Sequence, residues 1–141
     1  MEVEYEKYIK KIQIEARVLG DLAINHIVPT AITYQTTLIE NVKGLKLIFS
    51  DEEFNELAGA RKELIKEISN HISSIKSKTK DMIEARKVAN VIEHSREKAL
   101  AYEENVKPYL EEIRYHIDKL ELVVDNELWP LPKYRELLFT R

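Results

Sequence analysis

The 141-residue sequence contains no cysteine, which excludes disulfide bonds, thiolate nucleophiles and zinc sites built on sulfur. Glycine is also scarce, and Gly20, Gly44 and Gly59 each stand alone. A phosphate-binding loop needs clustered glycines, because the backbone N–H groups must approach the anion closely. The sequence therefore predicts no nucleotide-binding loop. The absence of cysteine fits a reducing compartment, and we expect a cytoplasmic protein.

Long apolar runs and an excess of positive charge are missing as well. No run approaches the roughly 18 apolar residues that a membrane span requires, and the N-terminal stretch at residues 1–4 is acidic where a signal peptide is basic. The 22 Lys and Arg against 25 Asp and Glu give a net charge of −3. This is the wrong sign for binding nucleic acid or an anionic membrane. We expect neither as a partner.

The sequence does contain apolar residues at steps of three and four, which predicts an all-α fold. The first predicted helix covers residues 3–49 and has two neighbouring apolar stripes, so we expect it to be central. Pro29 predicts a kink, because proline lacks an N–H and clashes with the carbonyl of Asn25. The first stripe consists of Tyr5, Tyr8, Ile9, Ile12, Ala16, Leu19, Ala23, Ile27, Ala31, Tyr34, Leu38, Val42 and Leu45, and the second of Ile14, Val18, Ile24, Val28, Ile32 and Ile39.

The later elements complete a single domain that we predict to be a bundle of three to four long antiparallel helices. Ser50 and Glu53 form a capping box that begins a helix over residues 51–76. A Ser- and Thr-rich stretch predicts a turn near residues 76–80, followed by a helix over 80–104. Pro108 either kinks that helix or begins a fourth over 107–125. Residues 126–141 contain Pro130 and Pro132 and predict an extended, docked C-terminal tail.

The predicted helix lengths are unequal. At 1.5 Å per residue the first helix extends roughly 65 Å, whereas each later helix extends only about 30 to 40 Å. We therefore expect the later helices to leave residues 5–24 short of partners, unless the tail or another polypeptide covers them.

No catalytic or metal-binding pattern is present. Carboxylate-bridged iron bundles use Glu-x-x-His, and none of the four histidines is preceded by glutamate at that spacing. Glu67 and Glu112 each lie four residues before a histidine, but two isolated pairs predict no metal site. Serine, aspartate and glutamate residues are spread along the helices, and no glycine-rich turn would bring their side chains together in one pocket. The sequence therefore predicts no catalytic triad. The histidines are His26, His71, His94 and His116.

Docking to another surface is the role that we predict for the residues that stand out. Arg17 and Asp21 are one helical turn apart beside an apolar stripe, which favours a structural ion pair and leaves open contact with a partner. The tail combines a tryptophan with prolines and large apolar residues. The predicted interface or docking residues are Tyr8, Ile12, Arg17, Asp21, Trp129, Pro130, Pro132, Tyr134 and Phe139.

Two segments carry a resemblance to a known family. Residues 8–23, continued by 25–29 and 34–35, resemble the beginning of the C-terminal region of type III glutamine synthetases. Residues 118–125 and the tail after them resemble the end of the same enzymes. The more specific motif is Trp129-Pro130-Leu131-Pro132-Lys133-Tyr134, continued to Phe139.

The resemblance implies a fragment of a glutamate–ammonia ligase that uses ATP with Mg²⁺ or Mn²⁺ in large ring-shaped oligomers. The family's nucleotide, glutamate and metal ligands find no match here, so no catalytic, cofactor-binding or metal residue is carried over. The implied role is a non-catalytic helical C-terminal domain. Its partners would be the catalytic domain of the same chain and neighbouring subunits of a homo-oligomer. The alternative is an independent helical adaptor that binds a partner helix or peptide, and a free-standing helical metalloenzyme comes third.

Overall fold

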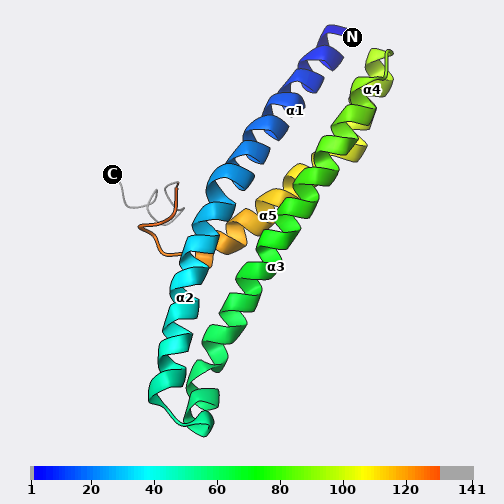
Figure 1. The fold of residues 1–141 in the computed structure, drawn as a ribbon. Coiled ribbons are helices and arrows are strands. Elements are labelled where there is room, and N and C mark those ends of the chain that lie inside the picture. Colours follow the sequence, from blue (N-terminus) through cyan, green and yellow to red (C-terminus); the bar gives the residue numbers. More distant parts are fainter. Residues whose placement is uncertain (1, 131–141) are drawn as a thin grey trace.

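The computed structural model describes residues 2–130, and every regular element within them is helical. The elements form three long helical stretches, and π-helical turns interrupt the first and the last of them. Figure 1 shows how these stretches lie side by side. The all-α prediction is confirmed for this part of the chain. The first helix comprises α1 (Glu2–Leu22), η1 (Ala23–Ile27) and α2 (Val28–Ile48), the second is α3 (Asp51–Asn90), and the third comprises α4 (Ser95–Ala101), η2 (Tyr102–Val106) and α5 (Lys107–Val123).

Both interior prolines follow a π-helical turn. The Val28 N–H donates to the carbonyl of Ala23, five residues earlier, and Pro29 comes next. The Lys107 N–H donates to Tyr102 in the same way, and Pro108 comes next. The wider turn relieves the clash between the proline ring and the preceding turn. The helical path thus continues through each proline, and the predicted kinks or breaks are not confirmed.

The turn predicted near residues 76–80 is wrong, because α3 runs through it as one helix of 40 residues. Ser and Thr lower helix propensity by only a few tenths of a kcal/mol each. Ile75, Thr79 and Met82, at 0%, 5% and 1% exposure, are packed in the interior here, and that burial outweighs the propensity. The chain reverses at residues 91–94 instead, so the predicted helices 51–76 and 80–104 do not exist as such.

A cluster of polar side chains fixes this reversal. Gln13 Nε2 on α1 donates to Asn90 Oδ1 at 3.2 Å and to the Tyr102 hydroxyl at 3.1 Å. The Tyr102 hydroxyl in turn donates to Asn90 Oδ1. The tyrosine is fully buried, so these bonds satisfy a polar group that water cannot reach. They join α1, the end of α3 and η2.

The long α3 also changes which part of the first helix is covered. It carries the chain back far enough for α4 and α5 to lie against α1, where Ile9, Ile12 and Ala16 are at most 6% exposed. The prediction that the later helices leave residues 5–24 short of partners is therefore wrong. The first stripe does face the core, but in the second stripe Ile14 and Val18 remain 48% and 62% exposed. The first helix is packed on one side and is not central.

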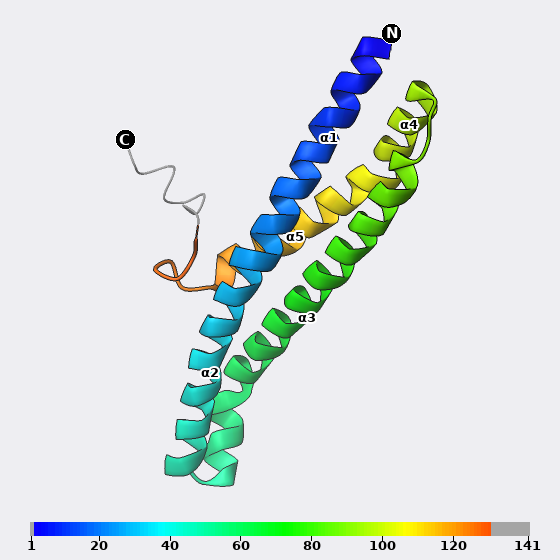
Figure 2. The same cartoon turned by 45° about the horizontal axis from the view of Figure 1, so that its top comes forward.

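The three helices do not overlap along their whole length. Figures 1 and 2 show α5 beside α1 and the upper half of α3, whereas α2 and the first part of α3 continue beyond it as a pair. We call residues 38–62 the two-helix arm. Its turn ends at the predicted N-cap: the Glu53 N–H donates to Ser50 Oγ at 3.3 Å, as expected. The Glu53 carboxylate accepts from the Ser50 hydroxyl at 3.0 Å and not from the Ser50 backbone N–H, so only the serine half of the capping box is present. The arm projects from a three-helix body.

In the irregular segment after α5, the side chain of Trp129 packs into the hydrophobic core. Trp129 is 6% exposed and belongs to the main hydrophobic core, whereas Pro130 is exposed. The remaining predicted tail residues, Pro132, Tyr134 and Phe139, lie outside the described residues. No helix within residues 2–130 is long and apolar enough to cross a membrane.

Candidate functional site

The predicted docking residues on α1 separate into two groups. Tyr8 is half-buried and its hydroxyl donates to Glu103 in η2. Ile12 is 3% exposed and lies in the core. These two residues contact their own chain. Arg17 and Asp21 are exposed and share one groove.

The groove lies between α1 and α3 and has a volume of about 260 Å³. Arg17 lines it from α1 and Arg86 from α3, so we call it the arginine groove. The expected Arg17–Asp21 ion pair is not found within residues 2–130; the Asp21 carboxylate instead accepts from Asn25 Nδ2 at 2.6 Å. The lining residues are Ala16, Arg17, Gly20, Asp21, Ile24, Thr79, Met82, Ile83 and Arg86.

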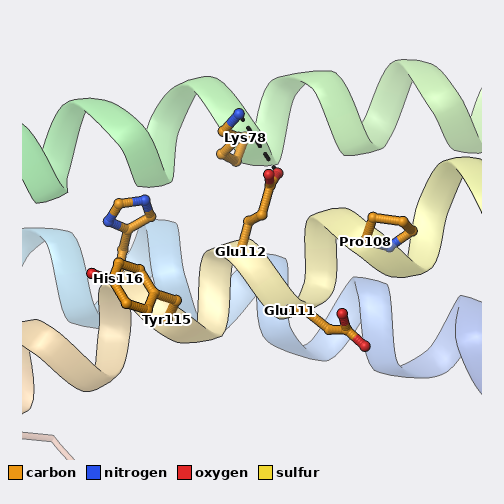
Figure 3. Close-up of a pocket in the computed structure, with 6 residues that line it drawn as sticks. All are labelled: Lys78, Pro108, Glu111, Glu112, Tyr115 and His116. Carbon is orange, nitrogen blue, oxygen red and sulfur yellow. Dashed lines mark ion pairs between the residues drawn. The ribbon is translucent and has the colours of Figure 1, made fainter.

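A second, more polar pocket of about 470 Å³ lies between α3 and α5 (Figure 3). His116 lines it, and its Nδ1 lies 2.8 Å from Nδ1 of His71 on α3. On the same pair of helices, Lys78 Nζ lies 3.6 Å from Glu112 Oε2. Glu67 Oε1 lies 3.8 Å from His71 Nε2. The sequence showed Glu67–His71 and Glu112–His116 as isolated pairs, and the packing of α5 on α3 brings the two histidines together.

The pocket does not fit a metal ion or a nucleotide. Within residues 2–130 no group of three or more His, Asp or Glu side chains is placed to hold a metal. Glu112 is paired with Lys78, and the two histidines bond each other. Gly20, Gly44 and Gly59 all lie inside helices, so none opens a loop towards a phosphate. We therefore derive no chemical step for ATP or a divalent metal from these residues.

Burial lowers the pKa of His116 below its ordinary value of 6.5. The charges of His71 and Lys78 act in the same direction, and Glu112 opposes them. The contact itself explains the repulsion between the rings: one Nδ1 must donate and the other must accept. If both imidazoles were protonated, two N–H groups would face each other.

The lowered pKa of His116 predicts that the stability of the chain depends on pH. Because the folded pKa of His116 lies below the unfolded value of 6.5, the unfolded state binds the proton more readily. Stability should be complete above that value and fall as pH decreases from it towards the folded pKa. We expect a loss of about 1 kcal/mol, the usual net contribution of one hydrogen bond. Thermal unfolding at about pH 7.5 and about pH 5.5 measures it.

Two variants provide the comparison for this measurement. His116→Gln removes the titrating group and should flatten the dependence, whereas His26→Gln removes an exposed histidine and should leave it unchanged. Equal pH dependence in the wild-type chain and in His116→Gln would show that the histidine pair is not its source.

The amino-acid sequence of the chain is similar to that of known proteins. Residues 1–46 match the family model described as glutamine synthetase C-terminal domain. The chain is 64% identical over 141 residues to a glutamine synthetase from Bacteroides fragilis (strain YCH46), covering 100% of this chain and 19% of that protein. It is 30% identical over 148 residues to a type-3 glutamine synthetase from Dictyostelium discoideum, covering 99% of this chain and 19% of that protein. The chain thus spans about a fifth of the length of these curated relatives.

Proposed function

Because the chain is related along its whole length to glutamine synthetases and matches their C-terminal domain over residues 1–46, we propose that it is the non-catalytic helical C-terminal domain of a type III enzyme. It contributes to subunit architecture by packing against the catalytic domain of the same chain and against neighbouring subunits of a homo-oligomer. The parent protein ligates ammonia to glutamate in the cytoplasm with ATP and Mg²⁺ or Mn²⁺. The catalytic groups lie in the rest of the parent protein.

The exposed apolar residues of the two-helix arm carry this proposal. Leu47 and Ile48 at its tip are 86% and 74% exposed, and Ile39 and Leu57 along it are 40% and 46% exposed. Single exposed apolar residues are common, but a projecting tip that presents two large ones together is typical of an interaction surface. These exposed apolar side chains are suited to pack against another domain or subunit.

The test is made on the full-length parent protein. Replacing Leu47 and Ile48 together by serine should weaken assembly, because each buried side chain of this size contributes about 1.5 to 3 kcal/mol. We expect the concentration at which the oligomer dissociates to rise at least about tenfold. Light scattering over a dilution series measures the mass of the assembly.

A matched control replaces Val91 and Leu122 by serine. These residues are 79% and 76% exposed but lie outside the arm. We expect this control to assemble like the wild type; equal behaviour of the two double variants would contradict a role for the arm. The 141-residue chain alone should form no glutamine above a buffer blank, and turnover would contradict a non-catalytic domain.

The alternative, an independent helical adaptor, has less support. Both relatives match the chain from end to end and continue well beyond it, as expected for part of a larger enzyme.

A further inference from the structure

We propose that the arginine groove binds an acidic side chain, an aspartate or glutamate flanked by aliphatic residues, on the part of the parent protein that lies outside these 141 residues. This inference rests on the proposed function, because it assigns one contact of the packing domain. It concerns the body of the domain, whereas the arm lies elsewhere.

The first argument is that the positive charges of Arg17 and Arg86 are not balanced by an ion pair in the described residues. Neither Arg17 nor Arg86 forms an ion pair or a hydrogen bond within residues 2–130. Nε of Arg86 is buried and has no hydrogen-bond partner. An unsatisfied buried donor is costly, and a guanidinium presents donors in the fork geometry that a carboxylate accepts. A carboxylate from outside would satisfy both arginines.

A second buried donor points to the same ligand. Thr79 is 5% exposed, lines the groove, and its hydroxyl has no hydrogen-bond partner in the described part of the chain. A hydroxyl can donate to a carboxylate oxygen. The lining contains one acid, Asp21, whose carboxylate accepts from Asn25, against two arginines and the Thr79 hydroxyl. The groove therefore offers more donors than acceptors.

The apolar lining of the arginine groove can contact the aliphatic residues that flank the acid, and the groove is large enough for one inserted side chain. Ile24, Met82 and Ile83 supply apolar surface, and Ile83 is 41% exposed. Gly20 lines the groove without a side chain, and a Cβ at that position would fit in ordinary van der Waals contact with Met82 Cε at 3.6 Å and Thr79 Cγ2 at 3.8 Å. A volume of about 260 Å³ is below the roughly 300 to 1,000 Å³ of small-molecule pockets. A protruding protein side chain is the better match.

The source of that side chain is the remainder of the parent protein. This chain covers only 19% of each relative, so most of the surface of such a protein lies outside it.

Charge reversal in the full-length protein tests the contact. Arg17→Glu should weaken assembly at least about tenfold, because it places a carboxylate opposite the inserted one. Arg17→Lys keeps the positive charge but loses the fork of donors, so it should weaken assembly less than Arg17→Glu. Lys11→Glu is the matched control, since Lys11 is exposed on another face of α1 and its reversal changes the net charge equally. Circular dichroism checks that all three variants fold. Equal assembly of Arg17→Glu and Lys11→Glu overturns the proposal.

Chemical cross-linking identifies the occupant. In Arg17→Lys, a carbodiimide joins the new amine to an adjacent carboxylate as an amide with loss of water, and mass spectrometry of the digest finds the linked peptide. A link from position 17 to an Asp or Glu outside these 141 residues supports the proposal. A link to Asp21, a link to an acid in a second copy of this domain, or no link overturns it.

The arm variants and the groove variants test the two proposals separately. If the serine variants of Leu47 and Ile48 weaken assembly while Arg17→Glu does not, only the groove assignment is wrong. If Arg17→Glu weakens assembly and the arm variants do not, the groove is the contact and the arm is not. If no variant in either region changes the assembly, both proposals fall together.

Discussion

Replacing Ser77 by proline should lower the free energy of unfolding by about 3 kcal/mol or more. Ser77 is exposed and lies in the middle of α3, where the sequence predicts a turn and the structure has unbroken helix. Proline there removes a backbone hydrogen bond and clashes with the preceding turn, yet it removes no buried side chain. The effect therefore reports only on the continuity of the helix. Urea unfolding followed by circular dichroism measures it.

The same substitution at the true reversal is the control. Ser95 is the first residue of α4, and His94 before it has φ −75° and ψ 121°, the extended conformation that a residue before proline prefers. Proline is favoured at the first position of a helix. Ser95→Pro should change stability by less than about 1 kcal/mol. If Ser77→Pro were the milder of the two, the chain would turn near residue 77 and not at residues 91–94.

Replacing Trp129 by alanine should destabilise the chain by about 3 to 5 kcal/mol, the range for deleting a large aromatic side chain from a core. Trp129 is 6% exposed and belongs to the same core as the three helices, although it follows α5 in an irregular segment. Its backbone N–H donates to the carbonyl of Asp125, which sets the turn that brings the ring back. Urea unfolding monitored by circular dichroism again gives the change.

Leu128→Ala is the matched control for this prediction. Leu128 is the adjacent residue and 38% exposed, so its truncation should cost less than about 1 kcal/mol. Similar losses in both variants would show that Trp129 has no special part in the core. A large loss in Trp129→Ala alone would confirm that the segment after α5 is part of the domain and not a free linker.

The sequence was informative where a signal is local. The first apolar stripe depends only on helical spacing, and its residues from Tyr5 to Leu38 lie in the core or pack against it, as predicted. The N-cap depends on Ser50 and Glu53, three residues apart, and the structure contains the bond from the Glu53 N–H to Ser50 Oγ. The resemblance to glutamine synthetase depends on the order of residues and is confirmed by the comparisons. The oligomer, the cytoplasmic location and the use of ATP and metal stay predictions.

The errors arose where weak local preferences compete with packing. The Ser- and Thr-rich stretch near residue 77 favours a turn by a few tenths of a kcal/mol per residue, but burial of Ile75, Thr79 and Met82 contributes several times more. Once α3 is continuous, α4 returns beside α1 and covers residues that were expected to lack partners. One misplaced turn therefore changed the predicted neighbours of the whole first helix.

By itself, the sequence determined that residues 2–130 are largely helical, that most of the first stripe of the first helix is buried, where α3 begins and which family the chain resembles. Each of these depends on residues near one another or on their order. Only the tertiary structure decided which distant residues meet. His71 and His116 are 45 residues apart in the chain and in hydrogen-bond contact, and Arg17 and Arg86 face one groove from different helices. Helical spacing fixes the face on which a residue lies. The lengths of the helices and the position of each reversal fix what lies opposite that face.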